Sequence, residues 1–303
     1  MSKTKTPFFS MGAQGSVAGS ITAQKLRRDT LIRGKPCPTD PYSLPQAYQR
    51  WLYQDYAYLW TKQNEATRRL YATYGTVYHL TAFQYWMKYH LKVMPDIVSW
   101  WRLDEGLGAI AYDQATDPHN GVIIGASPAA GVINRARFFD GLNDYVNIDP
   151  YPTGLFTAFT VLFFMNTPGF NGTWRAAIGW RDGIVTSVTQ SMCLETGNTI
   201  YHWLYNTTGA AVATNAPHAV STWELHGWTW DGTTMYAIRN SDLLNPQAIG
   251  GTFQPSCALQ LGKRPTAALP YWYDGYLDNL IIYNRTLDAT EIARWAGRSY
   301  PLQ

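Results

Sequence analysis

From Ile97 onward, hydrophobic and polar residues alternate in short runs such as IVSWWRL, YVNI and TMYAIRN, with Gly, Pro, Asn and Asp between them. A period of two places alternate side chains on opposite faces of a β-strand. The Asp-Gly pairs at 140–141 and 231–232 are expected to form tight turns, because Gly accepts a positive φ. The pattern predicts an antiparallel two-sheet sandwich over residues 97–303 that ends with one or two helical turns, ATEIARWAG.

Residues 42–96 do not show the period of two. Their long run QAYQRWLYQDYAYLWTKQNEATRRLYATYG contains no Pro and predicts helix. Ser43 is a candidate N-cap with Gln46 at the capping-box position, and Thr81 begins a second helix in the same way. Gly75 is expected to end the first helical stretch as a C-cap. The large apolar residues are too many for so short a segment to bury alone, so some of them are expected to contact a partner or the β domain.

Residues 1–41 are rich in Gly, Ser, Thr and Lys and show no sustained periodicity. Pro36, Pro38 and Pro41 exclude a helix in the segment that follows. We therefore expect an extended basic N-terminal arm. Since few large apolar residues precede Leu26, the arm has little means of packing on itself, and a neighbouring subunit in an oligomer is expected to hold it.

The composition favours a binding or assembly surface. Charged residues make up 15% of the 303 residues and hydrophobic ones 46%, while the chain contains 13 Trp and 21 Tyr. The charged fraction is below the usual quarter, so amide, hydroxyl and aromatic groups must cover much of the surface. A highly solvated enzyme is disfavoured on this ground.

The charge is distributed unevenly along the chain. Residues 1–96 carry 13 Lys and Arg against 5 Asp and Glu, a net charge of +8, whereas residues 97–303 carry 11 against 16, a net charge of −5. The positive charges are dispersed and accompany no known nucleic-acid-reading motif, so nucleic acid is not the favoured partner. A basic face that docks on an acidic neighbour is the preferred interpretation.

The cysteine positions and the hydropathy argue against further classes of protein. The three cysteines are far apart and show no CxxC spacing, so neither a disulfide framework nor a cysteine zinc site is expected. No run of 18 apolar residues is present, and the first 20 residues lack the apolar stretch of a signal peptide. Neither a membrane-bound protein nor a product of the general secretory pathway is expected.

Five longer motifs occur in order between residues 100 and 297: WWRLDEGLGAIAYDQATDPHNGVIIG, GVINRARFFDGLNDYVNI, FTAFTVLFFMNT, WELHGWTWDGTTMYAIRN and YWYDGYLDNLIIYNRTLDATEIARWAG. This series resembles the concanavalin A-like, laminin G-like jelly roll, and the closing GYLDNLIIYNRTLDATEI is its most specific part. The resemblance implies two curved antiparallel sheets around an apolar core.

The resemblance also implies a calcium site, because family members often bind one Ca²⁺ through oxygen ligands near the first and last strands. The matching positions are Asp104 in LDEG, Asp113 and Asn120 in YDQATDPHNG, and Asp278 in GYLDN. Asp and Asn are also ordinary turn formers, so turns and strand-end caps are the alternative interpretation.

No catalytic residue is predicted. The jelly-roll glucanases carry two carboxylates on one strand in an E-x-D-x-x-E run, whereas Glu105, Glu195, Glu224 and Glu291 are isolated here. The six histidines have no serine elbow, HExxH motif or cysteine partner beside them, and a structural role is favoured for each. We therefore expect a protein that is not an enzyme.

Sugar binding requires an aromatic platform for stacking together with a few polar groups. The candidates that could supply the platform are Trp174, Trp180, Tyr201, Trp203 and Trp272. The alternative is that these rings belong to the core of the sandwich or to a contact between subunits.

The N-terminal part has a looser likeness. Its Gly-rich start, the basic piece TAQKLRRDTLIRGKP and the helical run resemble the small domain of many phage and prophage virion proteins, a likeness with no functional residues to transfer. The residues expected to contact a partner are Lys25, Arg27, Arg28, Arg33, Trp51, Tyr58 and Trp86.

Three functions follow from these observations. The first is a non-enzymatic structural protein of a phage particle, assembled in the host cytoplasm, in which residues 1–96 anchor the chain to virion or self subunits. The jelly roll would then be displayed as a capsid decoration or attachment module. The second is a lectin or adhesin for host-surface glycans, and the third, less favoured, is a polysaccharide-degrading enzyme.

Overall fold

The computed structural model describes residues 2–4, 15–17, 21–26, 29–34, 43–149, 151, 154–169, 174–180, 190–196, 198–207, 210–255, 258–264 and 271–299. For the residues described between 2 and 34, and for 190–196, only the backbone is described. The chain divides into two compact units, Met1–Ala47 and Tyr48–Gln303.

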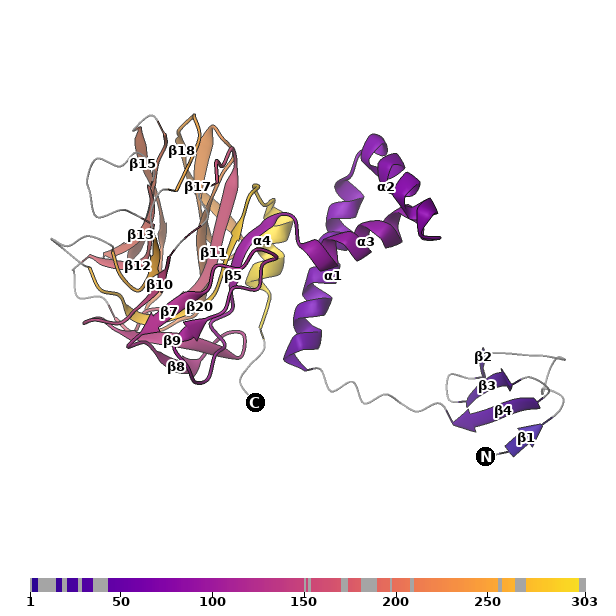
Figure 1. The fold of residues 1–303 in the computed structure, drawn as a ribbon. Helices are drawn as coiled ribbons and strands as arrows, with labels where there is room; N and C mark the ends of the chain where they lie inside the picture. The colour runs from indigo at the N-terminus through magenta and orange to yellow at the C-terminus, as the bar shows by residue number, and fades with distance from the viewer. Residues whose placement is uncertain are drawn as a thin grey trace. The chain divides into compact units, whose positions relative to one another are not determined.

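The first unit contains a small antiparallel sheet of four strands in the order β1-β4-β3-β2 (Figure 1). The strands are β1 (Ser2–Thr4), β2 (Gly15–Val17), β3 (Ile21–Leu26) and β4 (Asp29–Gly34). The segment expected to be a plain extended arm therefore pairs its extended pieces with one another. The basic stretch forms the β3–β4 pair, with Ile21 opposite Gly34 and Leu26 opposite Asp29.

Three helices follow, α1 (Leu44–Lys62), α2 (Glu65–Val77) and α3 (Ala82–Val93). The side chain of Gln46 accepts a hydrogen bond from the Ser43 N–H at 3.1 Å, as the capping-box spacing predicts. Thr81 is the N-cap of α3 with a complete capping box. Asn64 caps α2, a start that the sequence analysis did not anticipate.

The prediction that Gly75 is a C-cap is wrong. Gly75 lies inside α2, which continues to Val77, and its carbonyl accepts hydrogen bonds from the N–H groups of Tyr78 and Leu80. A Cβ at this position would lie 2.5 Å from the Leu80 carbonyl oxygen. Glycine is therefore needed because the chain returns against the helix, and not because the helix ends there.

The predicted jelly roll is confirmed as two large antiparallel sheets (Figure 1). One sheet has the order β15-β14-β13-β12-β19-β10-β7-β6. Its strands are β6 (Ile110–Ala111), β7 (Gly121–Ile124), β10 (Tyr145–Ile148), β12 (Arg175–Trp180), β13 (Gln190–Thr196), β14 (Thr199–Tyr205), β15 (Ala211–Pro217) and β19 (Leu259–Leu261).

The other sheet has the order β18-β17-β16-β11-β20-β9-β8, and β5 pairs with β20 beside this path. Its strands are β5 (Ile97–Trp101), β8 (Ser127–Ala130), β9 (Arg135–Asp140), β11 (Phe159–Asn166), β16 (Glu224–Trp230), β17 (Thr234–Arg239), β18 (Asp242–Ala248) and β20 (Asp274–Tyr283). The predicted closing helix is α4 (Ala289–Ala296), which Asp288 caps.

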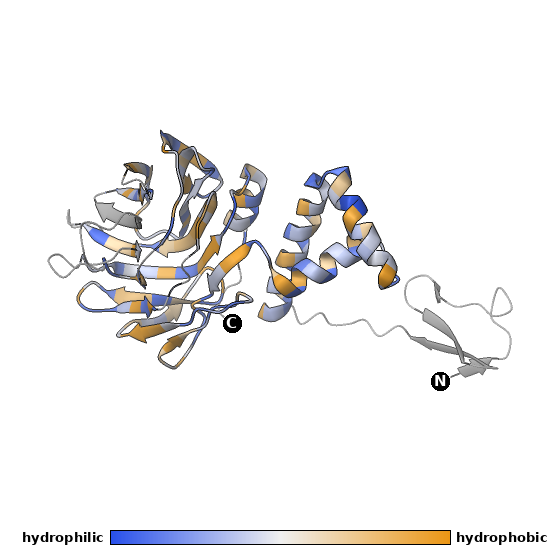
Figure 2. Ribbon diagram, turned by 45° about the horizontal axis from the view of Figure 1, so that its top comes forward, coloured by the Kyte–Doolittle hydropathy of each residue, from blue (hydrophilic) through white to orange (hydrophobic). Residues whose placement is uncertain are grey.

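The inner faces of the two sheets enclose one apolar core. Hydrophobic and hydrophilic residues alternate along several of its strands (Figure 2). Trp228 and Trp230 both lie in this core, as their spacing on one strand face predicts. Gly141 and Gly232 have φ values of 77° and 93°, which confirms the two Asp-Gly turns.

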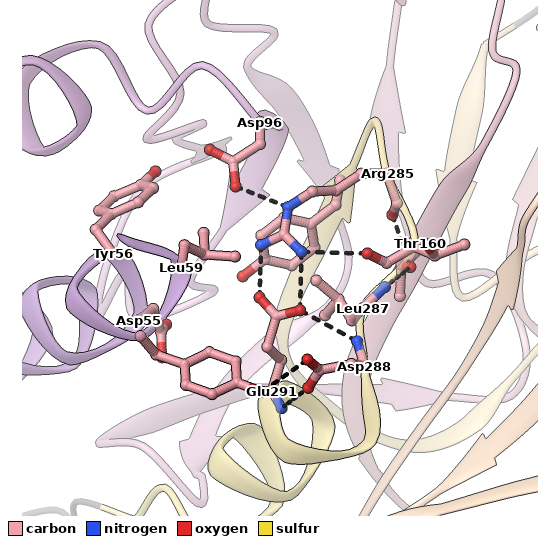
Figure 3. A network of polar contacts seen from close by, with 12 residues as sticks. Asp55, Tyr56, Leu59, Asp96, Thr160, Arg285, Leu287, Asp288 and Glu291 are labelled. Carbon is pink, nitrogen blue, oxygen red and sulfur yellow. Dashed lines mark hydrogen bonds and ion pairs between the residues drawn. The ribbon is translucent and has the colours of Figure 1, made fainter. Parts of the chain in front are cut away.

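Helix α1 packs on the sandwich beside α4. The Asp96 carboxylate accepts a hydrogen bond from Arg285 at 2.9 Å, and Arg285 also donates to both oxygens of Glu291 at 2.7 and 2.9 Å (Figure 3). The space left at this seam is about 10 Å³, room for about one water molecule. The helical segment thus contacts the β domain of its own chain, and a wider hollow of about 240 Å³ lies beside this contact, lined by residues that include Leu59, Trp86 and Arg285.

No helix in the described part of the chain combines the length and the apolar character that crossing a membrane requires.

Candidate functional site

The outer face of the β6–β15 sheet carries a row of aromatic rings on β14. Burial alternates along this strand: Ile200 and Leu204 are fully buried in the core, while Tyr201, Trp203 and Tyr205 are only partly covered. An antiparallel sheet with one solvated face produces this alternation. Two of the predicted sugar-contacting residues, Tyr201 and Trp203, therefore lie on the outer face.

Neighbouring segments extend this aromatic row. Trp174, 36% exposed, lies just before β12, and its ring centroid is 5.6 Å from that of Tyr201. Trp203 and Tyr271 both pack against Ala176, whose N–H donates to the Tyr271 carbonyl at 3.1 Å. We call Trp174, Tyr201, Trp203 and Tyr271 the outer aromatic patch.

A second aromatic group, next to Tyr271 in the chain, carries a cation. The ring centroids of Trp272 and Tyr145 are 5.9 Å apart, and the Lys263 Nζ lies 4.9 Å from the first and 4.5 Å from the second. The guanidinium of Arg264 lies 5.1 Å from the Tyr271 ring. Aromatic surface and positive charge are thus combined at this part of the sheet.

Trp180, the remaining sugar candidate, does not belong to this surface. It is 1% exposed, and its ring packs against Tyr151 and Phe253 with centroids 4.4 and 5.2 Å away. A register irregularity between Ala176 and Ile178 leaves Ile178 and Trp180 on the core side of β12. Sequence spacing alone does not reveal such a shift.

Two of the four predicted calcium ligands, Asp104 and Asp278, lie close together in a buried cluster. Asp104 accepts hydrogen bonds from the Arg135 N–H at 3.1 Å, the Asn134 amide at 3.2 Å and the Tyr48 hydroxyl at 3.1 Å. Asp278 accepts from the Ile133 N–H at 2.9 Å and from the amide of its neighbour Asn279 at 2.7 Å. Burial, with a smaller effect of the Asp104 charge, raises the pKa of Asp278 well above its usual value.

Asp113 and Asn120 form a separate capping arrangement. Asp113 Oδ1 accepts from the N–H groups of Trp100 at 2.8 Å and Ala115 at 3.0 Å, and its Oδ2 accepts from the His119 N–H at 3.0 Å. The side chain of Asn120 in turn accepts from the Asp113 N–H at 3.0 Å. This is the turn and strand-end chemistry that the sequence offered as the alternative.

The three predicted carboxylate ligands, Asp104, Asp113 and Asp278, do not converge on one point. Calcium takes six to eight oxygen ligands, whereas every side-chain oxygen of Asp104, Asp113 and Asp278 already accepts a hydrogen bond from a protein N–H or O–H group. Calcium binding stays a prediction that titration can test.

The residues predicted to bind a partner have varied positions. Trp86 is buried, and its indole N–H donates to the Tyr56 carbonyl at 3.0 Å. The Tyr58 hydroxyl donates to Asp288 at 2.7 Å, and the Trp51 ring lies 5.5 Å from the Arg298 guanidinium. These three rings therefore contact the chain's own helices or the residues that flank α4, an arrangement that comes from the tertiary fold.

The basic candidates lie in the first unit. Lys25 is in β3 and Arg33 in β4, and only the backbone of these strands is described. Arg27 and Arg28 lie outside the described residues. Their role in partner binding stays a prediction.

Of the four glutamates considered as catalytic candidates, three have described side chains, and each of these is engaged in structural contacts. Glu105 accepts from the Tyr112 N–H at 2.8 Å and pairs with Arg137 at 3.6 Å, and Glu291 pairs with Arg285. Glu224 faces Arg239 and two histidines, His218 and His226. Sequence reasoning gave each histidine a separate structural role and missed this convergence, although the alternation in Glu224-x-His226 places both side chains on one strand face.

The comparison with protein families agrees with the fold. The model of the concanavalin A-like lectin/glucanases superfamily, in its laminin G form, matches residues 112–293. The chain belongs to this superfamily. No curated protein matches the chain.

Several solved structures of toxin binding domains are similar to this chain. The botulinum neurotoxin serotype G binding domain has 12% identity and a TM-score of 0.52, over 66% of this chain and 50% of that one. The binding domain of Paraclostridial Mosquitocidal Protein 1 has 12% identity and a TM-score of 0.55, over 67% and 52%.

The botulinum neurotoxin serotype D ligand binding domain in complex with N-acetylneuraminic acid has 10% identity and a TM-score of 0.52, over 68% and 51%. The matches thus span about half the length of these structures. At such identities the likeness concerns the fold.

Proposed function

We propose that the protein is a lectin-like, non-catalytic glycan-binding module that uses the outer aromatic patch. The observation that carries this proposal is the row of partly exposed rings on β14 and beside β12, on the solvated face of a superfamily jelly roll. Flat aromatic rings bind the apolar faces of pyranose sugars, and polar groups around them fix the orientation.

The cations beside the patch favour an acidic sugar. Lys263 lies over the rings of Tyr145 and Trp272, and Arg264 lies beside Tyr271. An ammonium or guanidinium group at the edge of a stacking surface attracts a carboxylate on the bound sugar. The likeness in fold to a domain solved with N-acetylneuraminic acid supports sialylated glycans as the first probes.

Because the described glutamate carboxylates are paired with arginines, they support a binding role over hydrolysis. A glycosidase needs two carboxyl groups that face each other across the scissile bond. Glu105, Glu224 and Glu291, whose side chains are described, each pair with an arginine. Incubation with a polysaccharide that the protein binds should release no new reducing ends.

Titration calorimetry with sialyllactose and with neutral lactose tests the proposal. Trp174→Ala and Tyr201→Ala should each weaken binding about tenfold, the effect of losing one stacking ring. Lys263→Gln should reduce the preference for the acidic sugar. Tyr53→Ala on α1 is the matched control, since Tyr53 is 48% exposed and lies outside the patch. Equal affinity in the patch and control variants, or no binding to any acidic or neutral glycan, would refute the proposal.

We further propose that the first unit attaches this module to a phage particle. Support comes from the separation of Met1–Ala47 as its own compact unit, with its own sheet and a share of the basic charge. A chain that lacks residues 1–41 keeps all of α1 and should fold, yet should be lost from purified particles. Normal occupancy of the particle by this truncated chain would exclude the anchoring role.

A further inference from the structure

A second site with different chemistry lies inside the sandwich. His218 follows β15 directly, and Glu224 and His226 are on the same face of β16. The Ala219 N–H donates to Glu224 Oε2 at 2.9 Å, which holds the connection between the two strands closed and brings His218 against β16. All three residues are buried.

One nitrogen or oxygen atom of each of these three side chains, a possible metal ligand, lies close to the other two. His218 Nδ1 lies 3.0 Å from His226 Nε2 and 3.0 Å from Glu224 Oε2, and His226 Nε2 lies 3.4 Å from the same oxygen. Ligands placed about 2.1 Å from one Zn²⁺ ion in tetrahedral geometry are about 3.4 Å apart. One of the three separations equals this spacing and the two that involve His218 are about 0.4 Å shorter, so a small outward shift of His218 would let the three atoms share one ion.

We propose that His218, Glu224 and His226 form a structural binding site for a divalent transition-metal ion, with Zn²⁺ as the reference ion. Two imidazole nitrogens and one carboxylate oxygen are a donor set that suits zinc and its neighbours and not Ca²⁺ or Mg²⁺. The site is distinct from the outer aromatic patch, and the proposal is independent of glycan binding.

The surroundings orient the carboxylate for this role. Arg239 donates to Glu224 Oε1 from Nε at 3.0 Å and from Nη2 at 2.6 Å, which leaves Oε2 directed at the two histidines. Contacts of this kind fix the geometry of metal ligands in proteins. The guanidinium also opposes a cation, so the site should bind more weakly than one whose carboxylate has no cationic partner.

A nearby buried histidine provides a second, independent observation. His202 is fully buried, neither of its ring nitrogens has a hydrogen-bond partner, and its ring centroid lies 5.0 Å from that of Trp228. It is close enough to His226 for a charge on one ring to disfavour a charge on the other. A buried polar group without a partner is unfavourable, so the polar groups of this part of the interior are incompletely satisfied in the metal-free chain.

The burial of the cluster indicates what the ion would do. With all three ligands closed off from solvent, the ion would tie the β15–β16 connection to the sandwich, as structural zinc sites stabilise small domains. Substrate would have no route to it, so no reaction is assigned to the site.

Metal analysis of the full chain tests the proposal. After chelation and dialysis, the protein should take up close to one equivalent of Zn²⁺, and Co²⁺ in its place should give visible absorption of a site with nitrogen and oxygen ligands. Zinc in excess should raise the Tm by about 4 °C or more, while Mg²⁺ should leave it unchanged. This comparison of wild-type protein with and without metal does not depend on whether any variant folds.

Variants then locate the ion. His226→Ala and His218→Gln should lose the bound zinc and the shift in Tm, whereas His119→Ala, a change in a histidine outside the cluster, should keep both. Absence of zinc uptake and of any shift in wild-type protein would overturn the proposal, leaving a Glu224–Arg239 ion pair beside two neutral imidazoles. Zinc uptake that survives in folded His218 and His226 variants would overturn it equally, because the ion would then lie elsewhere.

Discussion

The Asp104–Asp278 cluster and the His218–Glu224–His226 cluster are both buried groups of titratable side chains in the jelly roll, yet they differ in what their ligand atoms face. In the first, backbone and side-chain N–H and O–H donors occupy the carboxylate oxygens. In the second, two ring nitrogens and one oxygen lie within 3.4 Å of one another, and that oxygen accepts one backbone hydrogen bond, from Ala219. Residue type therefore nominates a metal site, while the convergence of several ligand atoms on one point decides whether an ion fits.

The largest expected effect is a loss of protein stability when the Asp104–Asp278 cluster is disrupted. Asp278→Ala would leave the buried Ile133 N–H and the Asn279 amide without their acceptor and should lower the free energy of unfolding by about 3 kcal/mol or more. Urea denaturation measures the loss.

Asp278→Asn is the matched variant, since it keeps one acceptor oxygen and cannot ionise. Its loss should be much smaller, within about 1 kcal/mol. If Asp278→Ala were as stable as the wild-type protein, the cluster would not have the structural role that its hydrogen bonds indicate.

The two clusters should also contribute with opposite signs to the change of protein stability with pH. Burial lowers the pKa of His226 to about 4 and that of His202 well below its usual value, so on acidification from pH 7 to 5 the unfolded chain binds protons that the native state does not. These histidines should make stability fall with decreasing pH, by about 2 kcal/mol for one such group.

Asp278 acts with the opposite sign. Burial raises its pKa in the native state, so ionisation as the pH rises above the usual carboxyl range removes stability. Urea denaturation at pH 5, 6 and 7 should therefore show a steeper dependence for Asp278→Asn and a shallower one for His202→Phe. Identical slopes in both variants would show that these groups do not control the dependence.

The smallest expected effect is that of calcium. Because the oxygens of Asp104, Asp113 and Asp278 accept protein hydrogen bonds, millimolar Ca²⁺ should shift the Tm by less than about 1 °C. Differential scanning calorimetry with Ca²⁺ and with EDTA measures the shift. A clear increase that Asp104→Asn abolishes would restore the calcium site that the family resemblance implied.

Much of the architecture follows from local patterns in the chain. The period of two predicts the strands of the sandwich, the Asp-Gly pairs predict turns at Gly141 and Gly232, and Thr81 with its capping box predicts the start of α3. Each of these signals operates between residues a few positions apart, where backbone sterics and hydrogen bonding decide the outcome.

Other features depend on contacts between distant segments. A register shift in β12 puts Trp180 in the core, the return of the chain at Leu80 requires glycine at position 75, and Tyr58 reaches Asp288 only because α1 packs beside α4. Local periodicity carries no information about contacts between distant segments. The sequence therefore identified these residues as candidates but did not predict their positions in the fold.

The sequence by itself determined that this chain makes an antiparallel two-sheet sandwich, because strand alternation is a local property of the backbone. Only the tertiary structure decided which polar atoms meet inside it. His218 faces Glu224 and His226 because the connection after β15 folds back on β16, and the Asp104 and Asp278 oxygens are occupied because Arg135 and Ile133 lie opposite them. Lone pairs are assigned by what the fold places within about 3 Å, a range that sequence spacing does not fix.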